Sequence, residues 1–252
     1  MTVIQMAAVL LAGLAAGTIN TVVGSGTLIT FPTLLAFGVP PVTANVSNTI
    51  GLVPGVASGT WGYRRELRGQ RGRAIRLGSA SVVGGAIGAV LLLWLPSGAF
   101  SAIVPALIVV GLLLVVLQPR LSAWVDARRD GARSADGPWW VWPAVLLAGV
   151  YGGYFGAAQS VIIVGVLGIG IADSMQRLNG MKNVLAGLVN GIAGVIFILV
   201  ADVDWTVVAL IAIGSVIGGQ VGATVGRCLQ PLVLRVFIVL VGLVALAVFL
   251  LR

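Results

Sequence analysis

Two polar interruptions in long apolar runs carry the residues best suited to holding an anion. The first is Gly24-Ser25-Gly26-Thr27, and the second runs from Gly156 to Ser160 and contains Gln159. Each precedes a short apolar stretch that predicts a short helix, because glycine-rich breaks separate helices. A helix N-terminus presents backbone N–H groups and a partial positive charge, so it binds small anions. The competing interpretation is that these glycines only permit close packing of helices.

A second polar cluster, residues 173–183, opens a later apolar segment and contains two cations. Arg177 and Lys182 fall within a predicted membrane helix, where a charge is costly and usually faces a polar cavity. Lys182 is the only lysine among 15 basic residues, and its compact ammonium suits a small anion as a point charge. Two alternatives stay open: Arg177 pairs with Asp173 four residues earlier, and Lys182 bonds to backbone carbonyl groups.

Amide side chains accompany the cations and complete the candidate site. Asn179 and Asn183 lie in the second cluster, and Asn45 and Asn48 lie in the corresponding part of the first half of the chain. We expect these four amides to line one cavity together with the two breaks. The alternative is that they, like Asn190, form hydrogen bonds that hold helices together.

Several other kinds of site are excluded by the residue types present. The chain has no histidine, the commonest metal ligand and general base, and its one cysteine, Cys228, cannot form an internal disulfide or a cysteine metal site. We therefore expect no metal, no cofactor and an inert Cys228 thiol. The net charge of +8 comes from arginines in short links rather than from one basic face, so nucleic acid is not an expected partner.

The elements that must position these residues are membrane helices. The 252 residues are 59% hydrophobic and 9% charged, with a mean hydropathy of +1.11, whereas soluble domains have about a quarter charged residues. Several uncharged runs reach the roughly 20 residues that cross a bilayer as a helix. The composition predicts an all-α integral membrane protein and excludes soluble domains and β-barrels, whose strands alternate in polarity.

The chain divides into a first transmembrane repeat at residues 1–117, a cytoplasmic linker at 118–138 and a second transmembrane repeat at 139–252. The linker is rich in arginine, aspartate, serine and glycine, as solvated segments are. Within the first repeat, apolar runs and their glycine and proline punctuation predict five helices, over residues 3–23, 27–37, 42–63, 77–95 and 97–117.

The two halves are related by duplication. A shift of 132 positions superposes Gly24 on Gly156, and five further glycines on glycines, without a gap. The equivalent links differ in charge, because residues 64–76 hold six arginines and residues 202–204 hold no basic residue. Since basic links stay in the cytoplasm, these two links lie on opposite faces of the membrane. We predict two inverted repeats of about five membrane segments each, with broken or short half-helices, which is a transporter architecture.

These residues together resemble the TauE/SafE family of sulfite exporters, also called the sulfonate uptake permease (TSUP) family. The resemblance covers nearly the whole chain and rests on residues 13–32 and 44–49, Asn179-Gly180-Met181-Lys182-Asn183 and Val203-Asp204-Trp205. Family members often have a Gly-Gly-Gly core, where this chain has Gly24-Ser25-Gly26 and Gly156-Ala157-Ala158. The resemblance implies a multi-pass carrier of sulfite, sulfonates, sulfoacetate or related anions in a bacterial cytoplasmic membrane, working in either direction.

We accordingly expect a secondary transporter of a small organic or inorganic anion, working by alternating access, rather than an enzyme. Its expected partners are the anion and membrane lipid. Protons, carried by Asp173, are one candidate coupling ion beside facilitated diffusion or exchange, and a homodimer is one open assembly state. An intramembrane enzyme would need a serine beside Lys182, such as Ser25, Ser47 or Ser160. The other alternative, a channel or structural membrane subunit, is disfavoured by the paired helix breaks.

Overall fold

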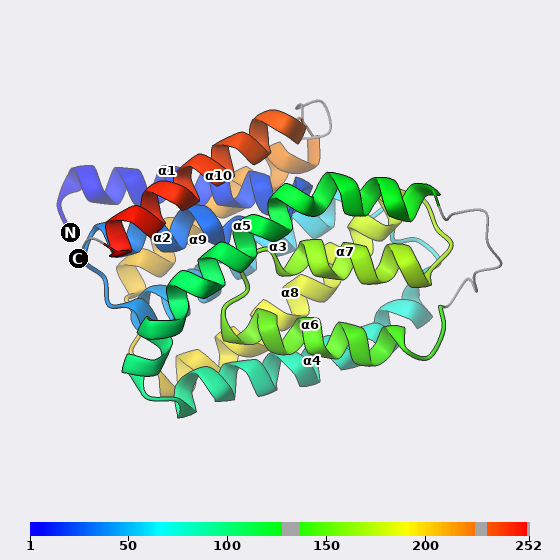
Figure 1. The fold of residues 1–252 in the computed structure, drawn as a ribbon, viewed down its shortest axis with the longest axis horizontal. Helices are drawn as coiled ribbons and strands as arrows, with labels where there is room; N and C mark the ends of the chain where they lie inside the picture. The colour runs from blue at the N-terminus through cyan, green and yellow to red at the C-terminus, as the bar shows by residue number, and fades with distance from the viewer. Residues whose placement is uncertain (128–136, 225–230, 251–252) are drawn as a thin grey trace.

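The structure is a computed structural model and describes residues 1–127, 137–224 and 231–250. In those ranges the chain forms ten α-helices and no strand, which confirms the predicted all-α fold (Figure 1). The helices are α1 (Val3–Val22), α2 (Thr27–Ala36), α3 (Pro41–Gly62), α4 (Arg71–Trp94), α5 (Ser97–Ala127), α6 (Val141–Tyr154), α7 (Gln159–Gly170), α8 (Met175–Val200), α9 (Trp205–Thr224) and α10 (Pro231–Leu250).

Five helices in the described residues are long and apolar enough to cross a membrane. They are α1, most of α5, and α4, α8 and α9. A further helix, α3, has a comparable length of 22 residues but is interrupted by polar side chains and Pro54. The chain is therefore a multi-pass membrane protein, as its hydropathy predicts.

Two short helices follow the glycine-rich breaks. The α2 and α7 helices have 10 and 12 residues, so they extend about 15 Å and about 18 Å, roughly half of the hydrocarbon thickness of a bilayer. The helix before α7, α6, is also short at 14 residues. The break regions consequently place helix ends, rather than helix middles, inside the membrane-embedded part of the fold.

The two breaks have the same backbone geometry. Gly24 and Gly156 both have positive φ angles, +91° and +76°, a conformation that glycine adopts without strain. In each break this glycine donates its N–H to the carbonyl five residues earlier, at 2.8 Å to Ile19 and 3.1 Å to Tyr151, which pairs a carbonyl of the last helical turn. The shift of 132 positions that relates Gly24 to Gly156 also relates Ile19 to Tyr151.

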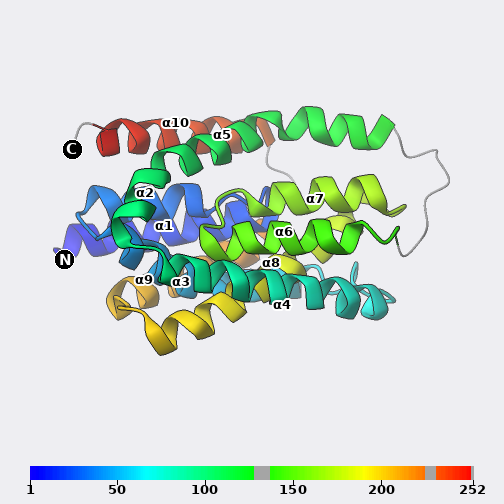
Figure 2. The same ribbon diagram turned by 60° about the horizontal axis from the view of Figure 1, so that its bottom comes forward.

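Each half of the chain packs mainly against the other half. The α1 helix lies along α9 and α4 lies along α6, while α3 contacts both α8 and α9. The short helix α2 packs against α10, and α7 packs against α5. These contacts are preserved when α1 to α5 are exchanged with α6 to α10. In Figures 1 and 2, α1 begins near the left end of the molecule, where α10 ends, whereas α6 begins at the right end.

Glycines allow the backbones of the paired helices to approach closely. A β-carbon at Gly218 would lie 2.1 Å from the carbonyl oxygen of Leu14, and one at Gly84 would lie 2.3 Å from that of Leu146. Leu14 and Leu146 are again 132 positions apart, so the same contact occurs at both helix pairs. For these glycines the close-packing interpretation is correct.

The linker region differs in part from the expectation. The α5 helix continues through Pro119 to Ala127 instead of ending near residue 117. The segment after the proline contains arginine, leucine and two alanines, which are good helix formers, and no glycine that would end the helix. Residues 128–136 of the expected linker lie outside the described residues, as does Cys228.

Candidate functional site

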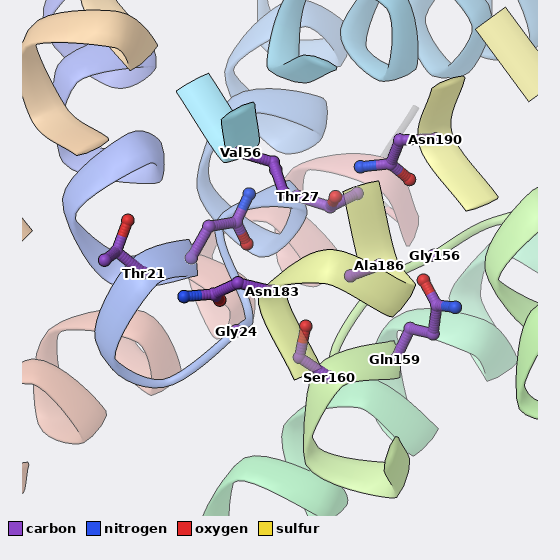
Figure 3. A pocket seen from close by; sticks show the side chains of 11 residues that line it. Thr21, Gly24, Thr27, Val56, Gly156, Gln159, Ser160, Asn183, Ala186 and Asn190 are labelled. Carbon is purple, nitrogen blue, oxygen red and sulfur yellow. The ribbon is translucent and has the colours of Figure 1, made fainter. Parts of the chain in front are cut away.

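One small cavity lies where the two breaks meet (Figure 3). Its volume is about 20 Å³, which is room for about one water molecule. Five helices and both breaks contribute to its wall. The lining residues are Asn20, Thr21, Gly24, Thr27, Val56, Gly156, Gln159, Ser160, Asn183, Ala186 and Asn190.

The first break lies directly against the first turn of α7. A β-carbon at Gly24 would stand 2.0 Å from the β-carbon of Ser160. The N-terminal residues of the two short helices, Thr27 of α2 and Gln159 of α7, both line the cavity. Two helix N-termini therefore direct their partial positive charges at one space.

Two amide groups in the cavity wall have unused hydrogen-bond donors. Gln159 Nε2 and Asn183 Nδ2 are buried and make no hydrogen bond within the described part of the chain, and each side chain is only 3% exposed. Gly152 makes room for the Gln159 amide, because a β-carbon there would lie 2.2 Å from the amide carbon. A buried donor left unpaired costs about 1 to 3 kcal/mol, so this wall is suited to a ligand that accepts hydrogen bonds.

The cavity wall carries no ionised side chain. Its polar members are asparagine, glutamine, serine and threonine. With two helix N-termini and unpaired N–H donors, its electrostatics favour an anion over a cation. The absence of a carboxylate from this wall removes the usual repulsion between acidic groups and an anionic ligand.

Lys182 lies behind this wall rather than in it. The side chain is 0% exposed, and Nζ donates to the carbonyl oxygens of Asn20 at 3.2 Å and Thr21 at 3.3 Å. Both carbonyls belong to the last turn of α1, which lacks partners within its own helix. The alternative of bonding to carbonyl groups is therefore what the structure shows, and direct contact between Lys182 and a ligand in this cavity is not.

Arg177 belongs to an ion-pair cluster at the start of α8. Its Nε lies 2.8 Å from Asp173 Oδ1, while Arg73 lies 2.7 Å from Asp173 Oδ2. A further hydrogen bond runs from Arg177 to the carbonyl of Arg68 at 3.3 Å. Partial burial by itself raises the pKa of Asp173, but the hydrogen bonds from Arg73 and Arg177 outweigh it and hold that pKa below its usual value. The pairing alternative for Arg177 is correct.

The remaining sequence candidates lie outside the cavity wall. Asn45 donates to the carbonyl of Tyr154 at 3.0 Å, and Asn48 accepts a hydrogen bond from Thr30, so both amides join helices. Gly26 donates its N–H to the Asn20 side chain at 2.7 Å. Ser25 is buried, and Asn179 is half-buried. Of the predicted residues, the cavity brings together Gly24, Thr27, Gly156, Gln159, Ser160 and Asn183.

Two amides of the cavity wall were missed as ligand-binding candidates. Asn190 lies two helical turns after Asn183, so it faces the same side of α8, and this spacing could have identified it. Asn20 is an amide at the end of an otherwise apolar helix, directly before the break that it supports. Its position about one helical turn before Gly24 could have identified Asn20 as a candidate.

Comparison with known proteins identifies the family to which the chain belongs. The family described as "Sulfite exporter TauE/SafE" matches residues 9–249. The chain is 27% identical to "Probable membrane transporter protein ORF9" of Sinorhizobium sp. over 245 residues, covering 96% of this chain and 91% of that protein. It is 27% identical to "Probable membrane transporter protein YfcA" of Escherichia coli K12 over 241 residues, covering 91% and 83%. The chain therefore belongs to the TauE/SafE family of membrane transporters.

Proposed function

We propose that the protein is a secondary transporter that carries a small oxyanion across a bacterial cytoplasmic membrane by alternating access and leaves it chemically unchanged. Sulfite, a sulfonate or sulfoacetate is the substrate class. The observation that carries this proposal is the meeting of two helix N-termini and two unpaired amide donors in one buried cavity. The names of the family and of its relatives support the transport part of the proposal.

The cavity chemistry suits a sulfur oxyanion in particular. A sulfonate presents three oxygens that accept hydrogen bonds and never donate. Gln159 Nε2 and Asn183 Nδ2 offer donors, and the N-termini of α2 and α7 add their partial positive charges. No proton transfer is needed for such binding, and no general base lines the cavity.

Alternating access is supported by the paired packing of the two halves. The contact of α1 with α9 corresponds to that of α6 with α4, and α1 and α6 begin at opposite ends of the molecule. This is the arrangement that two inverted repeats would give. At about 20 Å³ the cavity is smaller than a sulfonate, so helices must separate on one side or the other to admit the substrate.

A cluster of aromatic rings lies next to the break before α7. Phe155, next to Gly156 of the cavity wall, packs edge-to-face on Phe31 with ring centroids 5.2 Å apart. Phe100 contacts both rings, at 6.5 Å from Phe31 and 6.2 Å from Phe155. Ser101, which follows Phe100, lines a larger cavity of about 590 Å³ near Asp202. We assign these rings as the gate toward the outer face.

An ion-pair cluster joins the helices beside the arginine-rich link. Asp173 joins Arg73 of α4 to Arg177 of α8, and Arg177 also reaches the backbone of Arg68 in the arginine-rich link. These contacts hold the link and the starts of α4 and α8 together. We assign this cluster as the gate toward the cytoplasm, where the positive charge of the link places it.

The test is a counterflow assay with purified protein in proteoliposomes. Vesicles loaded with unlabelled sulfite should accumulate external ³⁵S-sulfite transiently, and chromatography should recover the label as unchanged sulfite. Sulfate, methanesulfonate and sulfoacetate serve as competitors. Saturable flux without counterflow would indicate a pore, and a chemically altered product would indicate an enzyme; either result contradicts the proposal.

A matched pair of variants links the flux to the cavity. Gln159→Leu removes the buried donor in the cavity wall, while Gln220→Leu removes an exposed amide whose side chain bonds to Ser58 on α3. We expect counterflow to fall at least about tenfold in the first, since a hydrogen bond to a charged group contributes about 1.5 to 3 kcal/mol. The second should transport as the parent does.

A further inference from the structure

Lys182 is a buried amine with an unusual set of partners. Within the described part of the chain, Nζ contacts two acceptors, the carbonyl oxygens of Asn20 and Thr21. A neutral amine has two N–H groups, and these two carbonyls satisfy both. An ammonium has a third N–H and a full positive charge, and neither finds a protein partner in the described residues. The two carbonyl acceptors around Nζ therefore match the hydrogen-bonding capacity of a neutral amine.

Within the described residues, no acidic group bonds to Nζ of Lys182. Residues 1–62, which include α1, α2 and α3, have no charged side chain, and neither does α7. The link after α3 packs on α8, because Leu67 lies against Gly180. The titratable side chains on this link, on the helices that pack against α8 and on α8 itself are Tyr63, Arg64, Arg65, Glu66, Arg68, Arg71, Arg73, Arg76, Tyr151, Tyr154 and Arg177, with Asp173 in the preceding loop.

These groups have other partners or lie at the ends of the helices. Asp173 is held by Arg73 and Arg177 at the start of α8, nearly two helical turns before Lys182. Tyr151 donates its hydroxyl to the carbonyl of Ala157 at 2.7 Å. The end of α1 supplies only the partial negative charge of a helix C-terminus. A protonated Lys182 therefore retains much of its charge without compensation.

An anion in the cavity would supply that compensation. Asn20 and Thr21, whose carbonyls hold Nζ, line the cavity, and so does Asn183, the neighbour of Lys182 on α8. The amine and the cavity are thus separated by one layer of protein. In a buried, weakly polarisable setting two opposite charges at such a separation stabilise each other, so the anion favours the ammonium and the ammonium favours the anion.

We propose that Lys182 is the proton-binding site that couples anion transport to protons, taking up one proton when an anion occupies the cavity and releasing it when the anion leaves. This inference rests on the proposed function, because it names the coupling ion of the same site. The only covalent change is transfer of a proton from water to the Nζ lone pair and its return. A proton and a monovalent anion then cross together, so the transport step is electrically neutral.

The test measures protons directly. Purified protein in a weakly buffered solution, free of sulfonate buffers, is titrated with methanesulfonate or sulfate at mildly alkaline pH while a glass electrode records pH. Both anions stay ionised throughout, so any proton taken up enters the protein. We expect close to one proton per anion bound, and an affinity that falls about tenfold per pH unit as the medium becomes more alkaline.

Three variants locate the proton. Lys182→Gln keeps two N–H donors for the Asn20 and Thr21 carbonyls but cannot titrate, so it should fold, bind the anion without proton uptake and lose the pH dependence. Arg76→Gln removes a cation of the neighbouring helix α4, and Glu66→Gln removes the carboxylate of the link whose Leu67 packs on Gly180 of α8. Both should take up protons as the parent does.

The outcomes separate this inference from the proposed function. Anion binding without proton uptake in the parent protein overturns the role of Lys182 and leaves the transport proposal standing. Uptake that survives in Lys182→Gln, or that disappears in Glu66→Gln, also overturns it. If neither methanesulfonate nor sulfate binds, the failure is that of the proposed function.

Discussion

Gly24 and Ser160 touch across the two halves of the protein, and a β-carbon at position 24 would lie 2.0 Å from the Ser160 β-carbon. One residue belongs to the break after α1 and the other to the first turn of α7. The contact brings the two short helices to a common point. It is the tightest of the β-carbon approaches at the glycines that line the cavity.

The first prediction concerns Gly24→Ala, with Gly38→Ala as its control. Both glycines have positive φ, +91° and +83°, so alanine meets similar backbone strain at each. Position 38 is surrounded by open space, whereas position 24 meets Ser160. We expect Gly24→Ala to lose about 1 to 3 kcal/mol more stability than Gly38→Ala, measured by thermal unfolding in detergent, because it overpacks the break.

A second substitution tests the cause of that loss. Ser160→Gly in the Gly24→Ala background removes the β-carbon and hydroxyl that the new methyl group meets. Stability should then return toward the level of Gly38→Ala. If the double variant is no more stable than Gly24→Ala, the Gly24–Ser160 contact does not determine the requirement for glycine.

A second prediction uses charge in the cavity wall. Gln159→Glu preserves the shape of a side chain that is 3% exposed but places a carboxylate beside the anion site. Repulsion between like charges should abolish sulfite binding, measured as the ligand-induced rise in melting temperature. Gln220→Glu, on the exposed face of α9, is the control and should bind sulfite normally. Equal binding by both variants would place the anion elsewhere.

The third prediction concerns the pH dependence of the cytoplasmic ion-pair cluster. The pKa of Asp173 is lowered in the folded protein, so its pairing stabilises the fold fully above the pKa of an unfolded aspartate, about 3.9. That stabilisation disappears as the pH falls through the folded pKa. Asp173→Asn should therefore be less stable than the parent at pH 7, by about 1.5 to 3 kcal/mol, and the difference should shrink as the pH falls below the unfolded pKa and through the lowered pKa of the folded protein. A difference that is independent of pH would exclude an ionic origin.

The two arginines of the cluster should differ in their contributions. The Arg73 side chain is 9% exposed and that of Arg177 is 35% exposed. Because solvent screens the more exposed pair, Arg177→Gln should cost under about 1 kcal/mol, and Arg73→Gln should cost more. Thermal unfolding at pH 7 of both variants in one detergent measures the order.

A fourth prediction tests the inverted repeat. Arg68 and Asp202 are both exposed, in the links that follow α3 and α8. Single cysteines at these positions, in a Cys228→Ala background, should react with a membrane-impermeant maleimide from opposite sides of the membrane. Labelling of both from the same side would show that the two halves have the same orientation.

Helix boundaries followed closely from the sequence. Predicted helices over 3–23, 27–37 and 42–63 correspond to α1, α2 and α3 within one residue at each end. The length of an uncharged run determines how many membrane helices it must contain, and glycine or proline residues mark where those helices end. Two boundaries were exceptions, because segments that contain charged residues were predicted to be links but are helical: α4 begins at Arg71 rather than at residue 77, and α5 continues past Pro119 to Ala127.

The candidate site was predicted in part, for a geometric reason. Asn183 lines the cavity, but its neighbour Lys182 does not. Successive residues point about 100° apart around a helix, so only one of the two can face a given cavity. The rotation of α8 is set by its packing against α3 and α4, and sequence periodicity does not reveal it in a helix that is apolar on most sides. The two breaks could be predicted from their glycines, because the position of a turn does not depend on how a helix is rotated about its axis.

The pairing of α1 with α9 and of α4 with α6 bears on how such a protein arose. Neither half can bury its own glycine-lined surfaces, because Gly218 closes on Leu14 and Gly84 closes on Leu146. A half-length ancestor would have had to satisfy those surfaces with a second copy of itself. With the inverted arrangement proposed above, such an ancestor would be a dual-topology dimer whose two copies insert in opposite directions. Fusion of its gene would fix both orientations in one polypeptide and would let one half acquire an amine, Lys182, that the other half lacks.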